Sequence, residues 1–148
     1  MTAALSACGT IPTPLAPSTQ SADTLRATSE TFTVNGQVLT VQGDAWISNS
    51  QGINSNPFII SVKVMSANRS IPAGVKPEKL YIIKGNEVWE TRFTNEYRGE
   101  NAPEGEKVAR TSTVFPASTR LTLVVQVETP AGDRLVRVAG EQEVTIPN

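Results

Sequence analysis

The sequence predicts an all-β domain, an antiparallel β-sandwich. From Thr31 onward, apolar residues recur at every second position and β-branched residues predominate, as in strands that bury one face and expose the other. Turn-forming pairs separate these runs at short intervals, and no segment sustains a helical period. Roughly eight to ten short strands with this spacing favour two packed sheets, and a small β-barrel is the alternative.

The first expected hairpin joins residues 32–34 to residues 37–41 through Asn35-Gly36. Asn-Gly is a strong hairpin signal because both central residues of such a turn take positive φ. The next expected strand covers residues 58–65, and we expect its apolar face to lie on the core. The apolar face holds Phe58, Ile60, Val62 and Val64, and the opposite face holds Ile59, Ser61, Lys63 and Met65.

The later strands alternate in the same way. Two further hairpins are expected, one with strands at 80–83 and 88–93 around Gly85-Asn86, and one with strands at 120–128 and 135–138 around a turn at 130–133. Their expected core residues are Trp89, Thr91 and Phe93 in one hairpin and Leu121, Leu123, Val125 and Val127 in the other. Trp46 or Trp89 is expected to be the central core indole. The connection at 66–78 is expected to cross from one sheet to the other.

The run Leu5-Ser6-Ala7-Cys8 holds an aliphatic residue, two small residues and the one cysteine of the chain. It resembles the lipobox at which bacterial lipoprotein precursors are lipidated on the cysteine sulfur and then cut before the cysteine. The resemblance covers nine residues and implies that Cys8 becomes a lipidated N-terminus, with residues 1–8 the remnant of a signal peptide. Acyl chains bury about 0.8 kcal/mol per methylene, enough to hold the protein at a membrane. Because the four residues before Leu5 lack the basic and apolar segments of a secretory signal, we expect the precursor to start upstream of Met1.

Residues 9–30 are rich in Pro, Ser, Thr and Ala. Three prolines between positions 12 and 17 oppose a helix there and favour extended polyproline geometry. We therefore expect residues 9–30 to be a tether and residues 31–148 to be the folded domain. The length of that domain suits a single hydrophobic core.

Composition and missing motifs exclude most chemistry. The chain has 13 Lys and Arg against 14 Asp and Glu, so it lacks the concentrated positive charge with which proteins hold nucleic acids. It has no histidine, which removes Ser-His-Asp and Cys-His nucleophiles and most zinc and copper sites. The patterns typical of hydrolases, nucleotide binding and EF-hands do not occur either. We expect a protein that is not an enzyme and that uses no cofactor or metal.

The segment 94–107 is longer than the two to five residues usual in a hairpin loop, and loops of such length are often functional. It contains four glutamates together with Tyr97 and Arg98, and tyrosine and arginine are enriched in binding hot spots. We expect a binding site here, with Tyr97 and Arg98 as anchors and Glu96 and Glu100 as polar contacts. Its glutamates lack the Asp-x-Asp spacing of a calcium loop.

In outline, the strands and turns resemble the immunoglobulin-like and fibronectin type III-like domains of bacterial surfaces, although the disulfide pair of antibody domains is absent. Combined with the lipobox, this resemblance implies a non-catalytic, lipid-anchored domain at the cell envelope, in the periplasm or on the cell surface. Its expected partners are the membrane and an envelope protein or glycan, which it binds or structurally supports. The alternative is a protease inhibitor or accessory subunit that presents the 94–107 loop.

Overall fold

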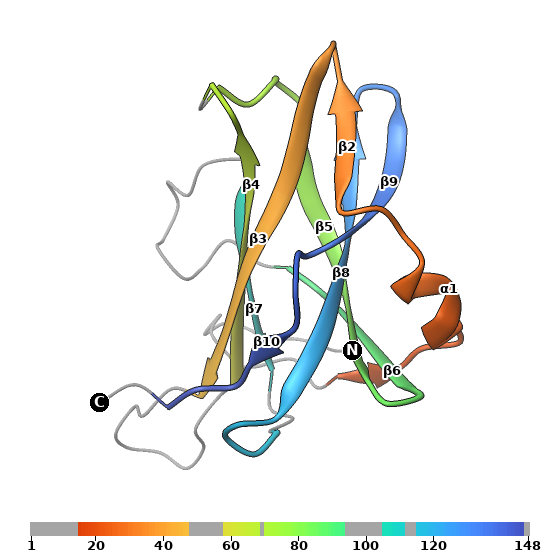
Figure 1. Ribbon diagram of the computed structural model, residues 1–148, viewed down its shortest axis with the longest axis vertical. Coiled ribbons are helices and arrows are strands. Elements are labelled where there is room, and N and C mark those ends of the chain that lie inside the picture. The colour runs from red at the N-terminus through yellow and green to blue at the C-terminus, as the bar shows by residue number, and fades with distance from the viewer. Residues whose placement is uncertain (1–14, 48–57, 69, 94–104, 112–114, 147–148) are drawn as a thin grey trace, which may run out of the picture.

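The computed structural model describes residues 15–47, 58–68, 70–93, 105–111 and 115–146. These residues form an antiparallel β-sandwich, which confirms the predicted fold class. The sandwich is not closed into a barrel. Figure 1 shows the two sheets packed face to face, with most strands running along the long axis of the domain.

Each sheet has a simple strand order. One sheet runs in the order β2 (Thr31–Val34), β3 (Gln37–Ile47), β4 (Phe58–Ser66) and β7 (Glu106–Thr111), and we call it the β3–β4 sheet. The other runs in the order β1 (Ala16–Pro17), β6 (Glu87–Arg92), β5 (Lys76–Lys84), β8 (Arg120–Thr129) and β10 (Gln142–Glu143), with β9 (Gly132–Arg137) also paired to β8, and we call it the β5–β8 sheet. The single described helix, α1 (Ala22–Arg26), lies outside this second sheet (Figure 1).

The predicted turns are present. Asn35 and Gly36 have φ angles of 52° and 79°, as the two-residue turn between β2 and β3 requires. Gly85, with φ of 62°, opens the two-residue loop between β5 and β6. The connection between β4 and β5 joins the two sheets, as expected for residues 66–78.

The core lies between the sheets and matches the predicted strand faces. Its two central rows are Phe58, Ile60, Val62 and Val64 of β4 and Leu121, Leu123, Val125 and Val127 of β8, all buried. Trp89 packs against this core, with its ring edge-on to Phe115 at 5.1 Å between centroids. The core indole is therefore Trp89, whereas Trp46 lies on the outer face of the β3–β4 sheet.

The C-terminal segment passes from one sheet to the other. β10 pairs with β8 through Gln142 and Leu121, and two residues after β10, Thr145 bridges to Trp46 of β3. Two backbone hydrogen bonds fix this crossing, from the Ile47 N–H to the Thr145 carbonyl at 2.9 Å and from the Thr145 N–H to the Ala45 carbonyl at 3.2 Å. The end of β3 is thereby paired along both edges.

Residues 15–30, expected to belong to a tether, pack on the domain instead. β1 adds to the edge of β6, and the N-cap Ser21 starts α1 by accepting a hydrogen bond from the Thr24 N–H. The helix buries Leu25 completely in a second, smaller apolar cluster on the outer face of the β5–β8 sheet. The other members of this cluster are Ala22, Tyr81, Ile83, Val88 and Val124, with Leu135 packed against it.

Polar contacts join the same N-terminal segment to the sheet. The Arg26 side chain donates to the Gly85 carbonyl at 2.8 Å, and the Arg137 guanidinium pairs with the Glu30 carboxylate at 2.8 Å. A proline-rich composition predicts an extended backbone, but it does not tell whether that backbone lies against a sheet. Residues 15–30 pack on the domain through the buried Leu25. The composition of residues 9–30 does not single out this residue.

Candidate functional site

The residues predicted from sequence to carry function lie outside the described residues. This holds for Cys8 and for the loop residues Glu96, Tyr97, Arg98 and Glu100. The ends of that loop are described: β6 ends at Arg92 in one sheet, and β7 begins at Glu106 in the other. The last two residues of the expected 94–107 loop therefore belong to a strand.

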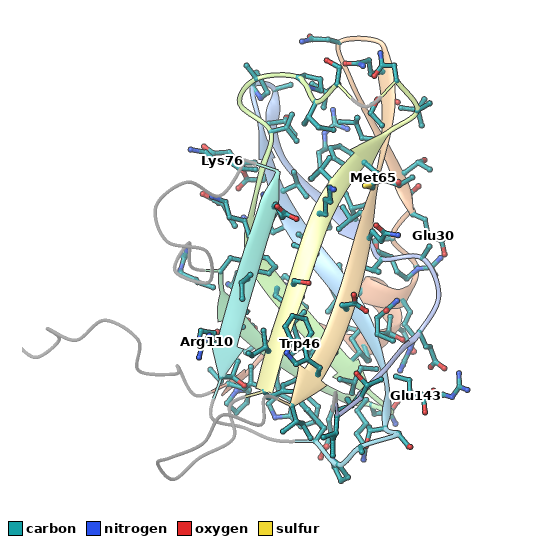
Figure 2. All side chains as sticks on the ribbon, turned by 90° about the vertical axis from the view of Figure 1, so that its left-hand side faces the viewer. Glu30, Trp46, Met65, Lys76, Arg110 and Glu143 are labelled. Atoms are coloured by element: carbon teal, nitrogen blue, oxygen red, sulfur yellow. The ribbon has the colours of Figure 1, made fainter. Side chains whose placement is uncertain are left out.

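The described surface offers a different candidate, on the outer face of the β3–β4 sheet. The strand register places outward side chains there in rows across β3, β4 and β7. The three rows are Trp46, Ile59 and Arg110; Asp44, Ser61 and Val108; and Gln42, Lys63 and Glu106. Figure 2 looks onto this face and shows Trp46 and Arg110 near one end of it and Met65 toward the other end.

This face is hollowed. One hollow, of about 290 Å³, is lined by polar side chains of three strands, namely Gln42, Asp44, Ser61, Lys63 and Glu106. A second hollow, of about 380 Å³, follows along β4 and is lined in part by Met65 and Ile71. The two hollows share Lys63, so they form one depression along β4. We call this depression, together with Trp46 at its end, the trough.

Trp46 is held in place by its backbone. It pairs with Ile59 of β4 on one side and with Thr145 on the other. In Figure 2 its indole extends from β3 over β4, the strand that carries Ile59. Ile59 is only 3% exposed although it points outward, and Trp46 itself is half-buried. The backbone of Trp46 is therefore held on both sides, which sets where its side chain leaves the sheet.

The floor of the trough cannot accept a ligand by strand addition. β4 is paired with β3 from Phe58 to Ser66 and with β7 from Phe58 to Lys63, so between Phe58 and Lys63 its backbone groups are already used in the sheet. A ligand in the trough must therefore be recognised by side chains. Among those, Gln42, Asp44 and Lys63 are exposed, and Ser61 and Glu106 are half-buried.

Arg110 lies in the row of Trp46, at the β7 edge of the face (Figure 2). Its Nε is buried and has no hydrogen-bond partner among the residues that the structure describes. Such orphaned donors are uncommon in folded proteins, because each costs the lost hydration of the group. At this end of the trough, the Arg110 guanidinium is therefore incompletely hydrogen-bonded within the described residues.

The outer face of the β5–β8 sheet is partly covered by the N-terminal segment of the same chain. α1 and β1 cover part of it, and an ion pair joins Lys79 Nζ to Glu90 Oε2 at 3.0 Å. Hydrogen bonds from Lys79 and from Ser18 hold the pKa of the Glu90 carboxyl below its ordinary value, and the same bond to Glu90 raises the pKa of Lys79. The ion pair joins β5 to β6, and the hydrogen bond from Ser18 ties the N-terminal segment to β6, so this cluster is part of the fold and is not a candidate ligand site.

A third hollow, of about 210 Å³, lies where β5, β6 and β7 approach one another. It is lined by Lys76, Glu78, Arg92, Phe93 and Lys107, with Pro77 between the first two. Lys76 also lies 3.9 Å from the Glu128 carboxylate. This hollow holds three cations, Lys76, Arg92 and Lys107, against the carboxylate of Glu78, and it is smaller than either half of the trough.

Within the described ranges, no group of three or more His, Cys, Asp or Glu side chains could hold a metal ion. No helix in that part of the chain has both the length and the hydropathy to cross a membrane.

Comparison with known proteins adds no family. No protein family model, no curated protein and no solved structure matches the chain. The resemblance to immunoglobulin-like and fibronectin type III-like domains therefore stays a prediction from pattern.

Sequence reasoning found half of the trough. The alternation in β4 predicted that Ser61 and Lys63 point outward, and the same alternation continued through β3 would have added Gln42, Asp44 and Trp46. The sequence could not show that β7 lies beside β4, because this pairing joins residues that are far apart in the chain. Glu106 was for that reason assigned to a loop.

Proposed function

We propose that this protein is a non-catalytic binding domain of the bacterial cell envelope, held at a membrane by lipid on Cys8. The observation that carries the binding function is the trough, a hollowed sheet face with a polar first hollow, a partly apolar second hollow and an indole at one end. A rigid sheet that presents side chains from three strands is well suited to hold a ligand without large rearrangement.

The anchor rests on the Leu5 to Cys8 run and on where the domain begins. Since Leu15 already packs against the core, only residues 9–14 separate Cys8 from the domain. An extended chain spans at most about 3.6 Å per residue, so the domain would be held within roughly 25 Å of the lipid. We propose a domain kept close to the membrane surface, where an envelope protein or glycan is within reach of the trough.

Replacing Cys8 by serine should release the protein from the membrane. The protein, expressed from its own genomic start, is expected to incorporate a fatty-acid analogue and to sediment with membranes, whereas Cys8→Ser is expected to do neither. Because Cys8 lies seven residues before Leu15, the variant should keep the melting temperature of the unlipidated domain. A natural protein that takes up no label would contradict the anchor.

The alternative of a protease inhibitor is separated by a second assay. An inhibitor that presents residues 94–107 should slow secreted proteases at stoichiometric concentration, and an envelope binding domain should leave proteolysis unchanged. Stoichiometric inhibition that is lost in the double variant Tyr97→Ala and Arg98→Ala would replace our proposal by that alternative.

A further inference from the structure

We propose that the trough binds a neutral polysaccharide chain, with one sugar ring stacked on Trp46. This inference rests on the proposed binding function and names its ligand class. The face of an indole is electron-rich, and the C–H groups on the flat side of a sugar ring carry a slight positive charge, so the two surfaces attract each other. Trp46 offers such a face at one end of the trough, on a backbone fixed by Ile59 and Thr145.

The polar side chains of the trough match hydroxyl groups. Beside Trp46, the next two rows supply carboxylate oxygens from Asp44 and Glu106, an ammonium from Lys63, and an amide from Gln42. Ser61 adds a hydroxyl that both donates and accepts. A sugar hydroxyl also donates and accepts at once, so a mixed set of donors and acceptors can satisfy it from several sides.

Charge favours a neutral chain over a charged one. The trough contains two carboxylates, Asp44 and Glu106, against the ammonium of Lys63 and, at the Trp46 end, the guanidinium of Arg110, so its formal charges balance. A polyanion would meet Asp44 and Glu106, and a polycation would meet Lys63 and Arg110, so neither gains a net attraction from the trough. A neutral polysaccharide meets neither penalty, and its binding should depend little on salt.

Composition favours a glycan over a protein partner. The cores of protein interfaces are depleted in Lys, Glu, Asp and Ser, which make up most of the first hollow. From Phe58 to Lys63 the floor also offers no unpaired strand to which a peptide could add, because β4 is paired there on both sides.

The dimensions suit a chain rather than a single sugar. From Trp46 to Thr40, opposite Met65, the trough follows β3 for six residues. At about 3.3 Å per residue this is roughly 20 Å, enough for several consecutive sugar units. We therefore expect longer oligosaccharides to bind more tightly than monosaccharides.

The test uses affinity electrophoresis of the folded domain in gels that contain soluble polysaccharides. The panel holds neutral chains (a β-1,3-glucan, a β-1,4-glucomannan and dextran) and dextran sulfate, which has the backbone of dextran with added negative charge. We expect at least one neutral chain to retard the protein and dextran sulfate to retard it less than dextran does. Retardation should change less than twofold between 0.05 and 0.5 M salt.

Variants assign the binding to the trough. Trp46→Ala should weaken it at least tenfold and Trp46→Phe should restore part of it. Asp44→Ala, at an exposed position that does not affect packing, should weaken it severalfold. Lys84→Ala, exposed on the other sheet, is the matched control and should bind like the natural protein.

Fluorescence gives an independent readout. In the Trp89→Phe background, Trp46 is the only tryptophan, so its emission should shift and its quenching by acrylamide should fall when the retained polysaccharide is added. Retention by no neutral chain, retention that Trp46→Ala and Asp44→Ala leave unchanged, or a preference for dextran sulfate would each overturn the inference. If an envelope protein instead occupied the trough, the proposed binding function would stand while the glycan assignment would fall.

Discussion

Replacing Ile60 by alanine is expected to lower the free energy of unfolding by about 2–5 kcal/mol, the usual range for a large aliphatic residue cut to alanine in a core. Ile60 is fully buried in the middle of β4, and its register partners are Ala45 of β3 and Ala109 of β7. Both neighbours are small, so they cannot fill the space that the lost methyl groups leave. Equilibrium denaturation in urea, followed by circular dichroism, measures the change.

The matched control lies three residues away on the same strand. Lys63 points outward and is exposed, so Lys63→Ala should change the free energy of unfolding by no more than about 0.5 kcal/mol. Similar losses for Ile60→Ala and Lys63→Ala would mean that the faces of β4 are assigned wrongly. The trough would then not exist as described, because its side chains depend on the same alternation.

Deleting residues 1–30 is expected to destabilise the domain far more than deleting residues 1–14. The longer deletion removes α1 and β1, and it uncovers the apolar cluster around Tyr81, Ile83 and Val124. The loss of the completely buried Leu25 alone should cost about 3 kcal/mol. For a domain of this size that corresponds to a fall in melting temperature of about 10 °C.

The second prediction is tested by comparing the melting temperatures of three proteins: the two truncations and full-length Leu25→Ala. The shorter truncation should melt within about 2 °C of the full chain, because it keeps Leu15 and all the other residues described in the core. Leu25→Ala should account for most of the loss seen in the longer truncation. Equal melting temperatures for both truncations would show that residues 15–30 do not stabilise the fold.

The long strands and tight turns were predictable from sequence, because their residue patterns agree with the faces that are buried and the backbone angles that the turns adopt. In β4 and β8 every second residue is apolar from Phe58 to Val64 and from Leu121 to Val127, and Asn35-Gly36 has the backbone angles that its turn demands. The weak elements carry no such signal. β1 and β10 are two residues long, and α1 is five, so neither periodicity nor propensity can reveal them.

The trough illustrates a second limit. Trp46 and Trp89 were equal candidates for the core, because a sequence shows that an indole is present but not which face of a strand the neighbouring sheet covers. The structure separates them: Trp89 meets Phe115 between the sheets, and Trp46 lies outside. A binding face assembled from β3, β4 and β7 needs pairings between residues that are far apart in the chain.

The most direct test of the trough as the binding face is photocrosslinking in living cells. A benzophenone amino acid is placed at Gln42 in the trough and, in a separate strain, at Lys84 on the other sheet, since both positions are exposed. Irradiation should join the Gln42 protein to an envelope component, seen as a product of higher mass, while the Lys84 protein stays unmodified. No product from Gln42, or equal products from both positions, would contradict the assignment of this face.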